Sequence, residues 1–188
     1  VITEASGSSS ADADILALET INSRQIIEAV HMIYDDLARE KGIIIRCASG
    51  DHHLVSDRAI LVRILSNLIS NAIKYSDGKR ILIAARHSAK GIRFQVWDQG
   101  MGIDDSTLDS LLARDAGRVR VHDHIAGEGA GLDICSDLAG RLGAELKARS
   151  KIGRGSVFEL LIPFPIFNAA PVWCSLVNGA GERSDIVE

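Results

Sequence analysis

The chain has 188 residues, of which 46% are hydrophobic and 24% are charged, a balance typical of a globular domain with a core of its own. Its 21 basic and 25 acidic side chains give a formal net charge of −4, and no long basic run offsets it, which argues against a general nucleic-acid-binding protein. No apolar run is long enough to span a membrane.

The N-terminal quarter of the chain predicts a linker, a helix and a strand. Residues 1–14 are rich in Ser, Ala and Asp and lack periodicity, which is typical of a linker. From about residue 20 to 41 apolar residues recur at helical spacing, and Gly42 follows in the C-cap role. The β-branched run over residues 42–49 then predicts a strand.

The middle of the chain predicts a second helix and a hairpin. Ser56 or Asp57 is placed to cap a helix that runs to about Tyr75. Residues 80–86 and 92–97 read as strands on either side of a short turn, which predicts a β-hairpin.

The remaining segments complete a two-layer fold. We expect a long irregular region over residues 99–126, followed by a helix over residues 131–142. A second hairpin joins residues 145–150 to residues 156–164. Because helices and strands alternate while two hairpins are present, we predict an α/β two-layer sandwich with a mixed, mostly antiparallel sheet packed on one face by helices.

The second predicted helix carries an unusual polar stripe. On a helical wheel of about 100° per residue, Asn67, Asn71 and Lys74 fall on one side and the apolar residues fall on the other. A solvated face ordinarily favours Glu, Lys and Gln, whereas a neutral amide oxygen suits Mg²⁺ and a lysine suits phosphate. These residues alone leave both a solvated surface and a phosphate site open.

A short glycine-containing segment follows the second strand of the first hairpin. Asp98 stands at the end of this strand, where its carboxylate is able to accept a hydrogen bond from an amino group such as that of adenine. Gly100 and Gly102 come next and allow positive φ and the close approach of a ligand. An ordinary loop is the alternative interpretation, because this pattern alone is weak.

A second glycine-rich segment leads into the last predicted helix. Gly127, Gly129 and Gly131 alternate and run directly into it. Bare backbone N–H groups before the positive end of a helix are typical of phosphate binding. A flexible hinge is the alternative, and the pattern differs from the dinucleotide-binding fingerprint, which needs a strand immediately before it.

The order of these segments resembles the catalytic ATP-binding domain of sensor histidine kinases, which belongs to the Bergerat-fold ATPases together with gyrase, Hsp90 and MutL. The likeness is carried by NLISNAIKYS, DQGMGI, GEGAGL and SKIGRGSVFELLIP in that order, and it covers about residues 20–164. The first three segments are similar to the N, G1 and G2 boxes of the family. The family fold is a mixed sheet packed on one face by helices, in agreement with the pattern-based prediction.

The resemblance implies ATP and Mg²⁺ as cofactors and a role for each matching residue. Asn71 matches the asparagine that coordinates Mg²⁺, and with Asn67 and Lys74 it forms the implied catalytic set. Asp98 matches the aspartate that reads the adenine amino group. The positions matched to the nucleotide pocket are Tyr75, Asp98, Gly100, Gly102, Ile103, Gly127, Gly129, Gly131, Leu132 and Ser156.

Asn67 favours phosphoryl transfer over hydrolysis. In hydrolytic relatives the residue four positions before the Mg²⁺ asparagine is a glutamate that activates water, whereas a neutral amide is a poor general base. The resemblance therefore implies transfer of the γ-phosphoryl group of ATP to a histidine. The segment between the G1 and G2 boxes corresponds to the ATP lid of the family, and its arginines are candidates to contact this phosphate. Plain solvated charge is the alternative for each of Arg114, Arg118 and Arg120.

Two departures from the family pattern define the alternatives. The region between the G1 and G2 boxes lacks the phenylalanine of the family's F box, and Leu111 and Leu112 stand there instead. The phosphoacceptor motif is absent, because His31 does not fit it, so we expect the acceptor histidine on a dimerisation domain outside this chain. The alternatives are a degenerate nucleotide-binding or protein-interaction signalling module and a Bergerat-fold ATP hydrolase.

We divide the chain into a linker or disordered tail (1–15), a histidine-kinase-type ATP-binding domain (16–164) and a tail of unclear role (165–188). Because the first residue is Val, we expect the chain to be part of a longer protein, cytoplasmic in this part even if the parent is membrane-anchored. The expected partners are the dimerisation and phosphoacceptor domain of the same protein and the receiver domain of a response regulator. We expect no nucleic-acid partner and a homodimeric parent protein.

Overall fold

A computed structural model describes residues 16–76, 80–112 and 130–165 of the chain. Several predicted features lie outside these ranges, namely both terminal tails, Gly127, Gly129, Arg114, Arg118 and Arg120. The elements run in the order β1 (Leu18–Asn22), α1 (Ser23–Glu40), β2 (Ile44–Ser49), β3 (His53–Asp57), α2 (Arg58–Tyr75), β4 (Arg80–Ser88), β5 (Gly91–Asp98), α3 (Asp105–Leu112), α4 (Ala130–Arg141), β6 (Glu145–Lys151) and β7 (Gly155–Pro163).

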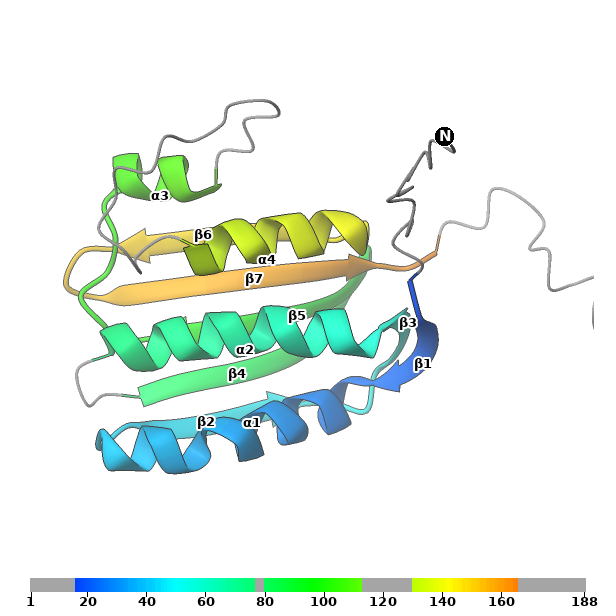
Figure 1. Cartoon of the computed structure of the whole chain (residues 1–188), viewed down its shortest axis with the longest axis horizontal. Coiled ribbons are helices and arrows are strands. Elements are labelled where there is room, and N and C mark those ends of the chain that lie inside the picture. The colour runs from blue at the N-terminus through cyan, green and yellow to red at the C-terminus, as the bar shows by residue number, and fades with distance from the viewer. Residues whose placement is uncertain (1–15, 77–79, 113–129, 166–188) are drawn as a thin grey trace, which may run out of the picture.

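The architecture is a two-layer α/β sandwich. Five strands form one sheet in the order β2-β4-β5-β7-β6, and α1, α2 and α4 lie across one face of it (Figure 1). The pair β2–β4 is parallel, while β4–β5, β5–β7 and β6–β7 are antiparallel. The predicted fold class and both predicted hairpins are therefore confirmed. Within the described ranges, none of the helices combines the length and the apolar surface that crossing a bilayer requires.

Helix α2 fills the centre of the core because its apolar residues recur at helical spacing. Eight of its side chains are buried, and they are Ile60, Leu61, Ile64, Leu65, Leu68, Ile69, Ala72 and Ile73. They belong to the same hydrophobic cluster as Ile81 and Ile83 of β4, Phe94 of β5 and Leu160 of β7. The core thus fixes the rotation of α2 about its axis and turns the polar stripe of the helix away from the sheet.

The structure corrects the prediction at the start of the domain. The first helix begins at Ser23 rather than near residue 20, because Asn22 caps it by accepting a hydrogen bond from the backbone N–H of Arg24 at 2.9 Å. The residues before it form β1, which pairs antiparallel with β3 in a separate two-stranded sheet. Short strands of mixed polarity depend on their partner for stability, and this partner lies more than thirty residues away along the chain.

A second correction concerns the region after β5. Residues 99–126 were expected to be irregular, whereas residues 105–112 form α3. Asp104 begins this helix by accepting a hydrogen bond from the backbone N–H of Thr107 at 2.9 Å, and its hydrogen bonds to Ser106 and Thr107 lower its pKa. Leu111 and Leu112 lie in the last turn of α3.

Asp57 is the N-cap of α2 and also accepts a hydrogen bond from the segment before β1. Its Oδ1 accepts from the backbone N–H of Ile60 at 3.0 Å, and its Oδ2 accepts from that of Ala17 at 2.9 Å. These two hydrogen bonds hold the pKa of the Asp57 carboxyl below its ordinary value of 3.8, and the one from Ile60 has the larger effect. Of the two capping candidates, Asp57 is confirmed, while Ser56 lies within β3.

We expect Asp57→Ala to lower the free energy of unfolding by about 1–2 kcal/mol at pH 7, because an N-cap and a second backbone contact are both lost. The folded-state pKa is depressed, so the stabilisation is present above the ordinary pKa of 3.8 and is lost as the pH falls through the folded value. Urea unfolding of both proteins from pH 7 to pH 3 measures this difference. Asp36→Ala, which removes an exposed carboxylate of α1, is the control, and an equal loss in both variants at pH 7 would contradict the capping role.

Candidate functional site

A cavity of about 410 Å³ lies on the helical side of the sheet at the end of β5. Helix α2, the start of α4, the loop after β5 and the β6–β7 hairpin all contribute to its wall. This volume falls in the range of small-molecule sites. The predicted site residues that line it are Asn71, Tyr75, Asp98, Gly102, Ile103, Gly131, Leu132 and Ser156.

Asp98 is the one acidic side chain on β5, and its carboxylate is held in place from two directions. Its Oδ1 accepts from the backbone N–H of Gly100 at 2.8 Å and from that of Ser156 at 3.2 Å. Burial raises the pKa of the Asp98 carboxyl, and the hydrogen bonds from Gly100 and Ser156 oppose this shift. Because both backbone donors meet Oδ1, the second oxygen keeps its capacity to accept a hydrogen bond from a ligand.

Gly100 and Gly102 are required by the path of the loop after β5. A Cβ on Gly100 would collide with the backbone carbonyl of Tyr75, so this glycine lets the loop pass close to the end of α2. Gly102 has a φ of +74°, and a Cβ there would collide with the backbone carbonyl of Lys151. The two glycines therefore bring the loop against α2 and the β6–β7 hairpin, which closes this side of the cavity.

A pair of serine hydroxyls fastens the same loop to the hairpin. Ser150 Oγ accepts from the backbone N–H of Ile103 at 2.7 Å and lies 2.9 Å from Ser156 Oγ. The backbone N–H of Gly153 donates to the carbonyl of Met101 at 2.7 Å. The sequence analysis predicts Ser156 but misses Ser150. No local sequence pattern marks a strand residue as the contact of a loop that is distant along the chain.

Asn71 lies where α2 meets the beginning of α4. A Cβ on Gly131 would come within 3.5 Å of Asn71 Nδ2 and 3.7 Å of Asn71 Oδ1, so the amide lies against the first turn of α4. The N-terminus of a helix carries unpaired N–H groups and a partial positive charge, which favour anions. The cavity therefore has an amide and a helix N-terminus on the same side.

Among the residues that the structure describes, three predicted site residues are not part of the cavity wall. Asn67 is half-buried one turn before Asn71, and Gly100 lies against the backbone carbonyl of Tyr75. Lys74 is exposed, with its Nζ 4.9 Å from the centre of the Tyr75 ring, a cation–π distance. Of the polar stripe on α2, Asn71 therefore lines the cavity, whereas Asn67 and Lys74 lie outside its wall.

Six further residues line the cavity and were missed by the sequence analysis: Ala72, Met101, Asp104, Thr107, Ile152 and Phe158. Met101 lies between two predicted glycines, and Phe158 belongs to the predicted last strand. Ile152 is exposed in the turn between β6 and β7, and no local signal distinguishes it from any turn residue. No group of three or more His, Cys, Asp or Glu side chains that could hold a metal ion occurs in the part of the chain that the structure describes.

Comparison with known protein families decides the identity of this fold. Residues 56–166 match the family described as histidine kinase-, DNA gyrase B-, and HSP90-like ATPases. The chain belongs to this ATPase family. The match begins just before α2 and extends past the end of β7, so it includes every element that lines the cavity.

Among curated relatives, the sensor kinase/phosphatase LuxQ of Vibrio vulnificus is 32% identical over 153 residues, which is 76% of this chain and 18% of LuxQ. The aerobic respiration control sensor ArcB of Escherichia coli is 32% identical over 120 residues, which is 61% of this chain and 15% of ArcB. The chain therefore spans less than a fifth of these relatives. It corresponds to the ATPase-type catalytic domain of sensor histidine kinases.

Solved structures of histidine kinases share the fold. The catalytic domain of the histidine kinase ThkA has a TM-score of 0.68 at 22% identity, and the match covers 79% of this chain and 96% of that one. Full-length ShkA in complex with AMPPNP has a TM-score of 0.69 at 26% identity, covering 80% of this chain and 32% of that one. These likenesses confirm the two-layer ATPase fold.

For the ligand-free domain, we expect Asp98→Asn to leave the free energy of unfolding at pH 7 unchanged or raised. Burial raises the folded-state pKa of Asp98, so the favourable contribution of its protonated form is present below pH 3.8 and is lost as the pH rises through the folded value. An amide removes the buried charge and keeps an oxygen for Gly100 and Ser156. Asp98→Ala is the matched comparison, because it leaves both N–H groups unpaired and costs about 1–3 kcal/mol. Urea unfolding measures both, and an equal loss in the two variants would show that the charge itself is structural.

Proposed function

We propose that this domain binds ATP together with Mg²⁺ and transfers the γ-phosphoryl group to a histidine on a dimerisation domain outside this chain. The observation that carries the proposal is the half-buried Asp98 carboxylate, held by two backbone amides in the wall of a cavity of about 410 Å³. A carboxylate that is fixed but keeps acceptor capacity suits the exocyclic amine of adenine. The apolar neighbours Ile103, Leu132 and Phe158 suit the faces of a purine ring.

The residues around Asn71 fit the phosphate end of the same ligand. The amide oxygen of Asn71 is the kind of neutral oxygen ligand that Mg²⁺ accepts together with phosphates and water. The first turn of α4 lies against this amide and offers backbone N–H groups to an anion. Bound Mg²⁺ would neutralise phosphate charge during transfer.

The two residues of the polar stripe that lie outside the cavity wall, Lys74 and Asn67, favour transfer over hydrolysis. Lys74 is exposed one turn beyond Asn71, where its ammonium is able to reach a phosphate as a point charge. Asn67 stands one turn on the other side of Asn71 and offers no carboxylate to activate water. Phosphoryl transfer requires mainly positioning and charge neutralisation, and these residues provide both without a general base.

The proposed partners follow from the same reaction. The acceptor histidine belongs to a dimerisation domain of the parent protein, which we propose is a homodimer in which this domain is cytoplasmic. The phosphoryl group then passes to the receiver domain of a response regulator. The histidine kinase ThkA, which shares the fold, has been solved in complex with the response regulator protein TrrA. ShkA, another relative in structure, has been solved in complex with AMPPNP.

We expect Asp98→Asn to weaken the binding of AMPPNP at least tenfold, because the amide nitrogen would present a donor to the donor group of adenine. Isothermal titration calorimetry on both proteins measures the affinity. A guanine analogue is the control ligand, and the native domain should prefer the adenine form by a larger factor than the variant does. Equal affinity of the native domain and the variant for AMPPNP would refute the role of Asp98.

We expect Asn71→Ala to abolish the increase in AMPPNP affinity that Mg²⁺ causes, while the melting temperature of the free domain stays close to native. The amide oxygen is proposed as the protein ligand of the ion, and the residue is only half-buried. Titration with and without Mg²⁺, together with thermal unfolding, separates the two effects. Unfolding of the variant would instead make Asn71 a structural residue. Failure of the native domain to bind at millimolar nucleotide would favour a protein-interaction module.

A further inference from the structure

The face of the sheet opposite the helices presents a row of side chains across all five strands. The strand register places Arg46 beside Leu82, Leu82 beside Trp97, Trp97 beside Val157 and Val157 beside Arg149. The neighbours of these residues along the strands, such as Ile83, Val96 and Phe158, are buried in the core on the other side. The row spans four strand spacings, or about 19 Å. Trp97 at its centre is 40% exposed.

This face is basic although the chain as a whole carries a net charge of −4. By strand alternation, its cations without an ion-pair partner among the described residues are Arg46, Arg80, Arg86, Arg149 and Lys151. On the helical layer, by contrast, Arg24, Arg39 and Arg58 are each paired with a carboxylate. The helical surface thus neutralises much of its own charge, whereas the sheet face does not.

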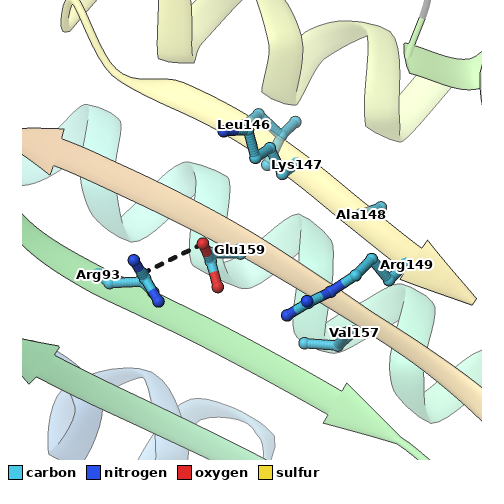
Figure 2. A pocket seen from close by; sticks show the side chains of 7 residues that line it. All are labelled: Arg93, Leu146, Lys147, Ala148, Arg149, Val157 and Glu159. Carbon is cyan, nitrogen blue, oxygen red and sulfur yellow. Dashed lines mark ion pairs between the residues drawn. The ribbon is translucent and has the colours of Figure 1, made fainter.

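Other charges of the sheet face, together with Arg149, lie close together across β5, β7 and β6. Figure 2 shows Arg93 of β5 beside Glu159 of β7, with Nε 3.1 Å from Oε1, and Arg149 reaching from β6 across β7. Gln95 donates to the other oxygen of Glu159 at 2.8 Å. Arg93, Glu159 and Arg149 line a hollow of about 400 Å³ together with Leu146, Lys147, Ala148 and Val157. Arg93 also lies directly opposite Arg86 in the strand register. A pair of like charges in this position lowers the stability of the sheet unless a ligand supplies negative charge.

We propose that this face, centred on Trp97 and flanked by Arg46 and Arg149, docks an acidic protein segment that presents carboxylates on either side of an apolar side chain. Trp and Arg are enriched at the energetic centre of protein interfaces. The unpaired arginines at both ends of the row supply charge complementarity to such a segment. This inference does not depend on nucleotide binding, because neither Arg46 nor Arg149 lines the cavity around Asp98.

The composition of the face favours a protein over a polyanion or a membrane. Glu159, paired with Arg93, and Glu145, paired with Lys147, interrupt the positive charge of the face, which a uniformly negative nucleic acid or lipid surface would not match. A protein segment is able to place an apolar or donor group at those positions. The face is small by the standard of stable complexes, so we expect a transient contact of the kind used in signalling.

The test uses a synthetic peptide with blocked ends, in which glutamates flank a central run of leucines. NMR titration of the isotope-labelled chain should give saturable shifts of the Trp97 indole N–H, assigned with Trp97→Phe, and of the β5, β7 and β6 amides. We expect Arg46→Glu combined with Arg149→Glu to weaken binding at least tenfold. The control is Arg39→Glu combined with Lys41→Glu, which changes the net charge equally at the end of α1 and should bind like native.

Several outcomes would overturn the proposal. These are equal peptide affinity of the Arg46/Arg149 variant and the native chain, shifts confined to the helical layer, and equal binding of a peptide with lysines in place of glutamates. Tighter binding of single-stranded DNA or of phosphatidylserine vesicles to the same face would replace the protein segment by that ligand. The melting temperature, which should be close to native in both variants, establishes that each is folded.

Discussion

The carboxylate of Asp98 is the point on which the site depends. It stands at the end of the central strand β5 and accepts from the backbone of its own loop, at Gly100, and from the first residues of β7, at Ser156. These hydrogen bonds join three segments that the hydrophobic core alone does not fasten. The same carboxylate is partly desolvated, which raises its pKa. Burial therefore disfavours the charged form of Asp98 in the folded domain. A residue kept under those conditions is a candidate for function rather than stability.

The two faces of the sheet divide the work of the domain. The helical face holds the core and, at the carboxyl end of β5, the cavity with Asp98 and Asn71. The opposite face carries little of the core and presents the row from Arg46 to Arg149 with Trp97 at its centre. Because alternate residues of one strand point to opposite faces, Trp97 and Asp98 are neighbours in sequence but belong to different surfaces. A contact on the sheet face is thus separated from the cavity that Asp98 lines by a single strand.

Helix α2 shows how one pattern serves both packing and chemistry. Its apolar stripe is buried against β4 and β5, so the rotation of the helix is fixed by the core. That rotation also sets the position of the polar stripe. Asn71 lies against the first turn of α4, and Lys74 is exposed to solvent. The membership of the chain in the ATPase family agrees with this arrangement, since the match includes α2, the loop after β5 and the β6–β7 hairpin.

The sequence by itself determined the elements that have strong local signals. The periodicity of α2, the Asp57 cap and both hairpins were predictable because each depends on residues close together in the chain. The order of the boxes predicted Asn71, Asp98 and Ser156 as site residues, and these three line one cavity. Tertiary structure alone decided the β1–β3 pairing, the role of Ser150 and the inclusion of Ile152 in the cavity wall. It also decided the row from Arg46 to Arg149, because its five residues lie on five strands and only the register brings them together.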